Sequence, residues 1–248
     1  MLIVANWKAY VDTRDEAKKL FALAKRLSLG VKRVRLVLAP PAPFLGLLAP
    51  GNRSKVAFAG QDVSVTTIGA ATGETSADAL KGIGATYVIV GHSERRLMGE
   101  TDAIVAEKLK RALANRLTPI LCVGERERDP DARYLSFIRE QVASAFKDLS
   151  PKERLDVIIA YEPVWAIGKT ANEALPASDL IEMTLYIRKI LSDYLPGRGA
   201  AKTRVLYGGS VEAGNIRELA GGSGIDGFLV GHASAEPASY SALVRALA

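Results

Sequence analysis

Short apolar runs, many of them rich in β-branched residues, alternate with longer amphipathic segments along the whole chain. Most of the short runs are continuously apolar, which is typical of parallel strands that are covered on both faces. The pattern predicts strands at residues 2–6, 34–39, 56–59, 87–90, 119–123, 157–161, 204–207 and 227–230.

The segments between these runs have the apolar spacing of amphipathic helices. In residues 13–28, one face carries Ala17, Leu20, Phe21, Ala24 and Leu27, and similar segments begin at Thr101, Asp131, Ser178, Glu212 and Glu236. This alternation predicts a (β/α)₈ barrel, with a doubly wound open sheet as the alternative, although that fold usually has a glycine-rich first turn. Because no linker divides the chain, we expect residues 1–248 to form a single domain.

The composition narrows the class of protein. The chain has 248 residues, 48% of them apolar, which is enough to bury a large core. Its net charge of +6 comes from 33 basic and 27 acidic residues that are interleaved, so a mildly basic solvated surface is favoured over a nucleic-acid site. The N-terminal sequence does not resemble an export signal, and no apolar run is long enough to span a bilayer. We therefore expect a soluble, cytoplasmic protein.

The only cysteine is Cys122, and no Cys/His cluster has the spacing of a zinc site, so neither a disulfide nor a metal is expected. In a parallel barrel, the loops after the strands converge on one face and carry the chemistry. The first strand ends at Asn6, and Lys8 follows it closely. The fourth strand is followed by GHSERR, which contains His92. A solvated lysine and a structural ion-pair network are the alternative interpretations of these two stretches.

The sixth strand leads into the apolar stretch EPVWAIG. Pro163 keeps Glu162 extended, so this carboxylate is fixed at the end of a buried strand. The following residues are typical of a lid that excludes water over a basic carboxylate; a buried connection around a satisfied glutamate is the alternative. The predicted lid comprises Pro163, Val164, Trp165, Ala166, Ile167, Gly168, Lys169, Thr170 and Ala171.

Small residues follow strands seven and eight, in YGGS and GHAS. They free backbone N–H groups to approach an anion, and phosphate sites recur after these two strands of barrels. Glycine also serves ordinary turns, so neither stretch is specific alone.

Together, ANWK, GETSADALKGIGA, GHSERR, CVGE, AYEPVWAIG, YGGSV and DGFLVG resemble the triosephosphate isomerase family across the whole chain, in that family's order. The resemblance implies interconversion of dihydroxyacetone phosphate and glyceraldehyde 3-phosphate through an enediolate, without a cofactor. It implies that Glu162 is the base, that neutral His92 is the electrophile, and that Lys8 supplies positive charge beside Asn6. Phosphate-binding roles fall to Gly168, Ser210, Gly231 and His232, and supporting roles to Ser93, Glu94, Glu125 and Tyr207.

The resemblance also implies a homodimer. Its contact would be the loop GAATGETSA, from Gly69 to Ala77, in which Thr72 approaches the partner's site; a plain surface loop is the alternative. Two features depart from the family pattern. The sequence after Gly168 reads KTANEALP, where the family commonly has Thr-Gly-Lys, and His232 replaces a usual glycine.

Two other functions remain open at this point. The altered lid could favour a four-carbon ketose phosphate such as an erythrulose phosphate. A barrel that has lost catalysis could instead bind RNA, but this would predict decayed catalytic positions and a clustered basic face. The intact Asn6, Lys8, His92 and Glu162 favour an enzyme.

Overall fold

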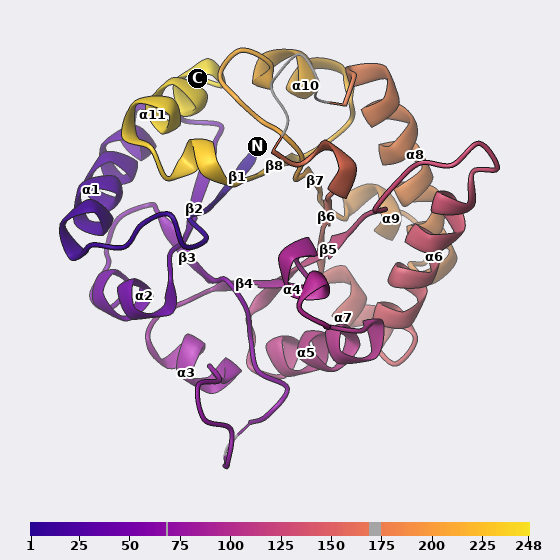
Figure 1. Ribbon diagram of the computed structural model, residues 1–248, viewed down its shortest axis with the longest axis horizontal. Helices are drawn as coiled ribbons and strands as arrows, with labels where there is room; N and C mark the ends of the chain where they lie inside the picture. Colours follow the sequence, from indigo (N-terminus) through magenta and orange to yellow (C-terminus); the bar gives the residue numbers. More distant parts are fainter. Residues whose placement is uncertain (68, 169–174) are drawn as a thin grey trace.

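The strands of the computed structural model close into a parallel eight-stranded barrel (Figure 1). The structure describes residues 1–67, 69–168 and 175–248. Neighbouring strands follow the order of the chain, and β1 closes the barrel by pairing with β8. The strands are β1 (Leu2–Asn6), β2 (Arg35–Ala39), β3 (Ala57–Gly60), β4 (Tyr87–Val90), β5 (Thr118–Val123), β6 (Ile158–Tyr161), β7 (Val205–Tyr207) and β8 (Gly227–Val230). The predicted barrel is confirmed, and the open-sheet alternative is wrong.

Helices form a ring around the barrel (Figure 1). Several begin where the sequence offers a capping side chain; for example, the Thr13 hydroxyl accepts the Glu16 N–H at the start of α1. The helices are α1 (Arg14–Gly30), α2 (Ala42–Leu48), α3 (Ala77–Gly82), α4 (Ser93–Leu97), α5 (Asp102–Ala114), α6 (Arg133–Phe146), α7 (Pro151–Leu155), α8 (Ala177–Tyr194), α9 (Gly199–Lys202), α10 (Ile216–Gly222) and α11 (Pro237–Ala246), and short 3₁₀ turns are η1 (Val164–Ala166) and η3 (His232–Ser234).

The strands are apolar on both faces because each face has its own core. Alternate side chains, such as Val4, Ile89 and Leu206, pack together inside the barrel. The side chains between them, such as Ala5 and Val90, pack outward against the helices. This two-sided burial is why the strand runs do not alternate with polar residues.

Four predicted strands begin one residue later in the structure than the sequence pattern indicated, at residues 35, 57, 158 and 205. At three of them, a buried valine precedes the strand. Val34, Val56 and Val157 are buried, yet they precede the first residues of β2, β3 and β6. Their side chains belong to the outer core, while their backbones lie outside the ladder. Apolar patterning reports burial, and burial extends slightly beyond strand pairing.

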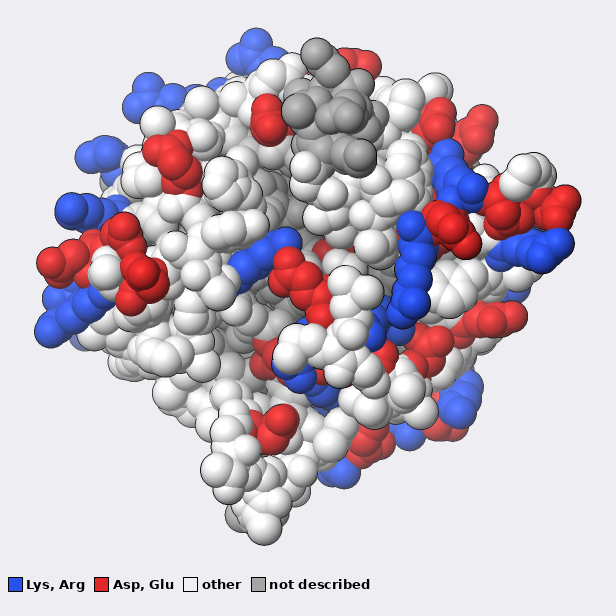
Figure 2. All heavy atoms as spheres, in the orientation of Figure 1, with Lys and Arg blue, Asp and Glu red and all other residues white. Residues whose placement is uncertain are grey.

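The face viewed in Figures 1 and 2 is the one on which α4 and the loops after the strands gather. Acidic and basic side chains are interspersed over this face, as the sequence pattern indicated (Figure 2). The segment between β3 and α3 projects from the body at the lower edge, and its tip carries little charge (Figures 1 and 2). Within the described ranges, no helix is long and apolar enough to cross a membrane.

Candidate active site

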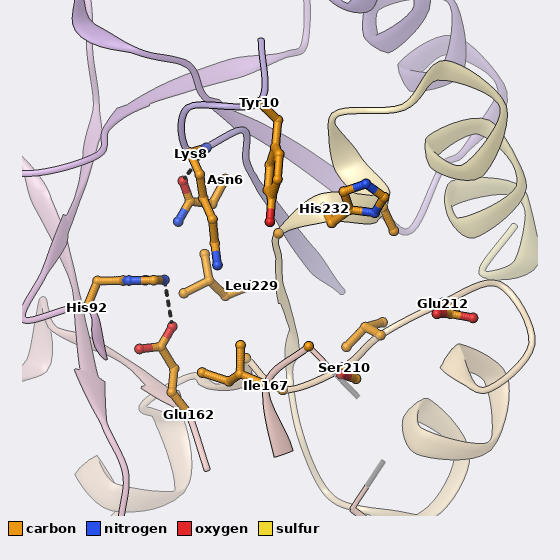
Figure 3. A pocket seen from close by; sticks show the side chains of 16 residues that line it. Asn6, Lys8, Tyr10, His92, Glu162, Ile167, Ser210, Glu212, Leu229 and His232 are labelled. Atoms are coloured by element: carbon orange, nitrogen blue, oxygen red, sulfur yellow. Dashed lines mark hydrogen bonds and ion pairs between the residues drawn. The ribbon is translucent and has the colours of Figure 1, made fainter. Parts of the chain in front are cut away.

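A pocket of about 350 Å³ lies at the carboxyl ends of the strands (Figure 3). Its lining includes most of the residues that the sequence predicted to carry chemistry. His92 and Glu162 lie at one end of it, and Ser210 and His232 lie at the other (Figure 3). The pocket is lined by Asn6, Lys8, Tyr10, His92, Glu162, Ile167, Gly168, Gly208, Gly209, Ser210, Val211, Glu212, Leu229, Gly231, His232 and Ala233.

Glu162 directly follows β6, and its side chain is almost fully buried, with 2% of the residue exposed. Its backbone N–H donates to the Val123 carbonyl (2.8 Å). The Ser93 N–H donates to Glu162 Oε2 (3.0 Å), while Oε1 remains directed at the pocket. A Cβ on Gly208 would lie 2.8 Å from Glu162 Cγ, so this glycine makes room for the carboxylate. The predicted extended, strand-end glutamate is thus held by neighbouring elements.

His92 lies between β4 and α4, and it caps the N-terminus of α4. The Glu94 N–H donates to His92 Nδ1 (3.2 Å), which requires a lone pair on that nitrogen. The proton of the ring is therefore on Nε2, which lies 3.2 Å from Glu162 Oε1 (Figure 3). This arrangement provides a neutral imidazole whose N–H faces the pocket.

We predict that nitrogen NMR at about pH 7 will show His92 as a neutral imidazole protonated on Nε2. The chain contains only two histidines, so the His92→Gln variant assigns the signals without ambiguity. A protonated Nδ1 would contradict the hydrogen bond from the Glu94 N–H, and with it the orientation of the ring.

Lys8 adopts a left-handed backbone conformation (φ 47°), which is uncommon for a residue with a side chain. The turn is held because the Lys8 N–H donates to Asn6 Oδ1 (3.1 Å) and the Gln61 amide donates to the Lys8 carbonyl (2.9 Å). Lys8 Nζ donates to Glu94 Oε1 (2.7 Å). A Cβ on Gly231 would lie 3.1 Å from Lys8 Cε, so the absence of a side chain there gives the lysine its place.

The far end of the pocket is built from the loops after β7 and β8. Among the described residues, the backbone N–H groups of Ser210, Gly231 and His232 have no hydrogen-bond acceptor. The Ser210 hydroxyl donates to the Ala166 carbonyl (3.0 Å), which connects this end to η1. Backbone N–H groups without an acceptor in the described part of the chain are suited to bind an anion, and Gly231 lies beside Lys8.

The first part of the predicted lid is anchored by Glu125, which is 1% exposed. The Tyr161 hydroxyl and the Trp165 Nε1–H both donate to Glu125 Oε1 (2.9 Å each). The Arg128 guanidinium lies over the Trp165 ring, 5.0 Å from its centroid. Burial, reinforced by the Glu125 charge, raises the pKa of Tyr161, so its hydroxyl remains a donor.

Gly168 has a φ of +75°, a value that a side chain would strain, so the turn after Ile167 requires glycine. The remaining predicted lid residues, Lys169, Thr170 and Ala171, lie outside the described residues.

Tyr207, at the end of β7, is fully buried, and burial raises its pKa to about 12.

The sequence pattern missed Tyr10, Glu212 and Leu229, which also line the pocket. It also missed that the Cys122 thiol lies close to Glu162. Burial and the Glu162 charge raise the pKa of this thiol well above its ordinary value. A neutral thiol thus lies under the carboxylate. Of these residues, only Tyr10 could have been assigned to the site from the sequence, because it follows the predicted site residue Lys8 by two positions. Within the described parts of the chain, no group of His, Cys, Asp and Glu side chains could hold a metal ion.

Comparisons with known proteins point to one family over nearly the whole length of the chain. A family model described as triosephosphate isomerase matches residues 1–247. The triosephosphate isomerase of Moorella thermoacetica is 42% identical, over 98% of this chain and 97% of that protein. The triosephosphate isomerase of Thermus thermophilus is 42% identical, over 99% of this chain and 98% of that protein. That of Symbiobacterium thermophilum is 36% identical, over 100% of this chain and 96% of that protein.

Proposed function

Because the chain belongs to the triosephosphate isomerase family, and so interconverts dihydroxyacetone phosphate and D-glyceraldehyde 3-phosphate, we propose that Glu162 is its base. The observation that carries this proposal is the buried Glu162 carboxylate, whose Oε1 lies 3.2 Å from His92 Nε2. Glu162 takes a proton from C1 of dihydroxyacetone phosphate and returns it to C2. The chemistry needs a base beside the carbons and a donor at the oxygens, and this end of the pocket offers both.

His92 donates a hydrogen bond from Nε2 to the carbonyl oxygen, where negative charge develops as C1 loses its proton. It then moves protons between the two oxygens of the enediolate. The Glu94 N–H on Nδ1 supports this role, since it fixes both the tautomer and the direction of the ring.

Lys8 supplies positive charge between the two ends of the pocket, and Asn6 positions it through the Lys8 N–H. The substrate phosphate binds to the backbone N–H groups of Gly168, Ser210, Gly231 and His232. This divides the pocket into a reacting end at His92 and Glu162 and a phosphate end at Ser210 and His232 (Figure 3).

The lid closes over the bound substrate. Its apolar residues exclude water from the enediolate, whose phosphate is otherwise lost in a side reaction. Four residues support the site. Ser93 positions Glu162, Glu94 positions Lys8, Glu125 positions Trp165, and Tyr207 positions the turn at Gly209. For Tyr207, the fit is close, because a Cβ on Gly209 would lie 2.2 Å from its hydroxyl.

A coupled assay tests the activity directly, with glyceraldehyde 3-phosphate as substrate and reduction of the dihydroxyacetone phosphate formed as the readout. For a four-carbon ketose phosphate, oxidation of the aldose phosphate formed is the readout, and comparison of the two substrates measures substrate preference. We expect kcat/KM to be higher for the three-carbon substrate. Higher efficiency with the four-carbon compound would contradict the proposed fit of the pocket.

The enzyme acts as a homodimer through the loop from Gly69 to Ala77. Support comes from the way this loop projects from the body and carries little charge at its tip, as expected of a segment that packs into another subunit (Figures 1 and 2). The Ser64 N–H donates to the Thr75 carbonyl (2.9 Å), which closes the base of the loop. The compartment that we propose is the cytoplasm, where glycolysis supplies and consumes its substrates.

Replacing Thr72 with arginine should convert the dimer into a monomer, because it places a long charged side chain on an exposed turn of the docking loop. Sedimentation should then show half the native mass. Ser192→Arg, on the exposed side of α8, is the matched control and should remain dimeric. A dimeric Thr72→Arg protein would show that this loop is plain surface structure.

A further inference from the structure

The two histidines of the chain line the same pocket from opposite ends (Figure 3). The proposed reaction uses the ring of His92 but only the backbone of His232. The His232 ring is nevertheless held: it meets the Tyr10 ring edge to face, with centroids 5.1 Å apart and planes at 81°. The Tyr10 side chain extends into the pocket between Lys8 and His232 (Figure 3).

Both rings are carried by rigid backbone. The Tyr10 N–H donates to the Trp7 carbonyl (3.0 Å), in the same tight turn that gives Lys8 its left-handed conformation. On the other side, the fully buried Ser234 donates its hydroxyl to the Val230 carbonyl (2.9 Å), which fixes η3 against β8. The two rings therefore have a defined place at the phosphate end.

We propose that the His232 imidazole, steadied by Tyr10, is a second cationic binder of the substrate phosphate, so that affinity for phosphate esters rises when the ring takes up a proton. This inference rests on the proposed function, which places the phosphate at this end of the pocket. A dianion stabilises an imidazolium beside it, so the added affinity is present in mild acid and disappears as the pH rises.

The charged groups that face His232 leave it available for this role. Lys8 pairs with Glu94, and the ion pairs that histidine makes among the described residues both belong to His92. Glu236, on the chain after η3, instead accepts the N–H groups of Ala238 and Ser239. The hydrogen bonds from Ser239 lead the lowering of the pKa of Glu236, to which the nearby His232 also contributes, and Glu236 therefore remains anionic.

Glu212 is the remaining carboxylate at this end, on the loop after β7. Its negative charge opposes a bound dianion, and a protonated His232 offsets that charge. Of the residue types at the phosphate end, histidine is the one that can change its charge between mild acid and neutrality.

Sulfate is the probe of choice, because it remains a dianion over this whole range whereas phosphate itself titrates. Isothermal calorimetry should show that sulfate binds the native protein about tenfold more tightly at about pH 6 than at about pH 8, the gain expected from one charge-assisted hydrogen bond. His232→Asn keeps a polar side chain that cannot become cationic, and it should lose this gain. Glu212→Gln tests the carboxylate that lines this end and should retain most of the gain.

Tyr10 has its own pair of variants. Tyr10→Phe keeps the edge-to-face contact and should retain the gain at about pH 6, whereas Tyr10→Ala removes the contact and should reduce it. Equal sulfate affinity of the native protein at the two pH values would overturn the proposal, and so would a full gain in His232→Asn. Because calorimetry needs no turnover, these results are independent of the isomerase assay, and each proposal can fail alone.

Discussion

Replacing Glu162 with glutamine is expected to lower kcat by a factor on the order of a thousand to ten thousand, the usual effect of removing a positioned base. The amide has nearly the shape of the carboxylate, and its oxygen can still accept the Ser93 N–H, so only the contact between Oε1 and His92 Nε2, at the pocket, is lost. The variant should therefore fold normally, and it should bind sulfate with nearly native affinity, because the phosphate end is unchanged.

Glu162→Asp is the informative companion variant. It keeps a carboxylate but withdraws it by one methylene from the pocket, so kcat should fall between those of the native protein and Glu162→Gln. Stopped-flow or steady-state assays with both substrates provide the measurement. A glutamine variant that retains a tenth of the native activity would remove Glu162 from the proton transfer.

The barrel could be predicted from the sequence because both faces of its strands are buried. Continuous apolar runs such as Tyr87–Val90 have few interpretations in a chain of this length, and their regular alternation with amphipathic helices indicates closure. The reacting residues could also be predicted from the sequence. Asn6, His92 and Glu162 each follow or end a strand, and all strands of a parallel barrel point to the same face.

Contacts between separate loops could not be predicted in this way. The meeting of Tyr10 with His232 depends on two turns whose geometry is local, but whose separation is set by the closure of β1 onto β8. Likewise, Cys122 lies beneath Glu162 because β5 and β6 are neighbours in a register that pairs Cys122 with Ala160. An apolar pattern fixes which residues are buried, but the partners of a buried residue follow from the register.

His92→Gln is expected to lower kcat by a factor of about a hundred to a thousand, as when a donor to a developing oxyanion is lost. The glutamine amide can donate a hydrogen bond toward the substrate oxygen, so part of the stabilisation remains. It cannot exchange a proton between the two oxygens as imidazole can, and this step should limit the variant.

His92→Asn separates this chemical role from a structural one. Asparagine is a good N-cap and can accept the Glu94 N–H, so α4 should remain intact, but its side chain is too short to reach the substrate oxygen. Its kcat should therefore fall at least as far as that of His92→Gln, with the thermal unfolding midpoint nearly unchanged. Loss of stability with kcat reduced less than tenfold would mean that His92 serves the helix, and that the donor at the carbonyl oxygen is another group in the pocket.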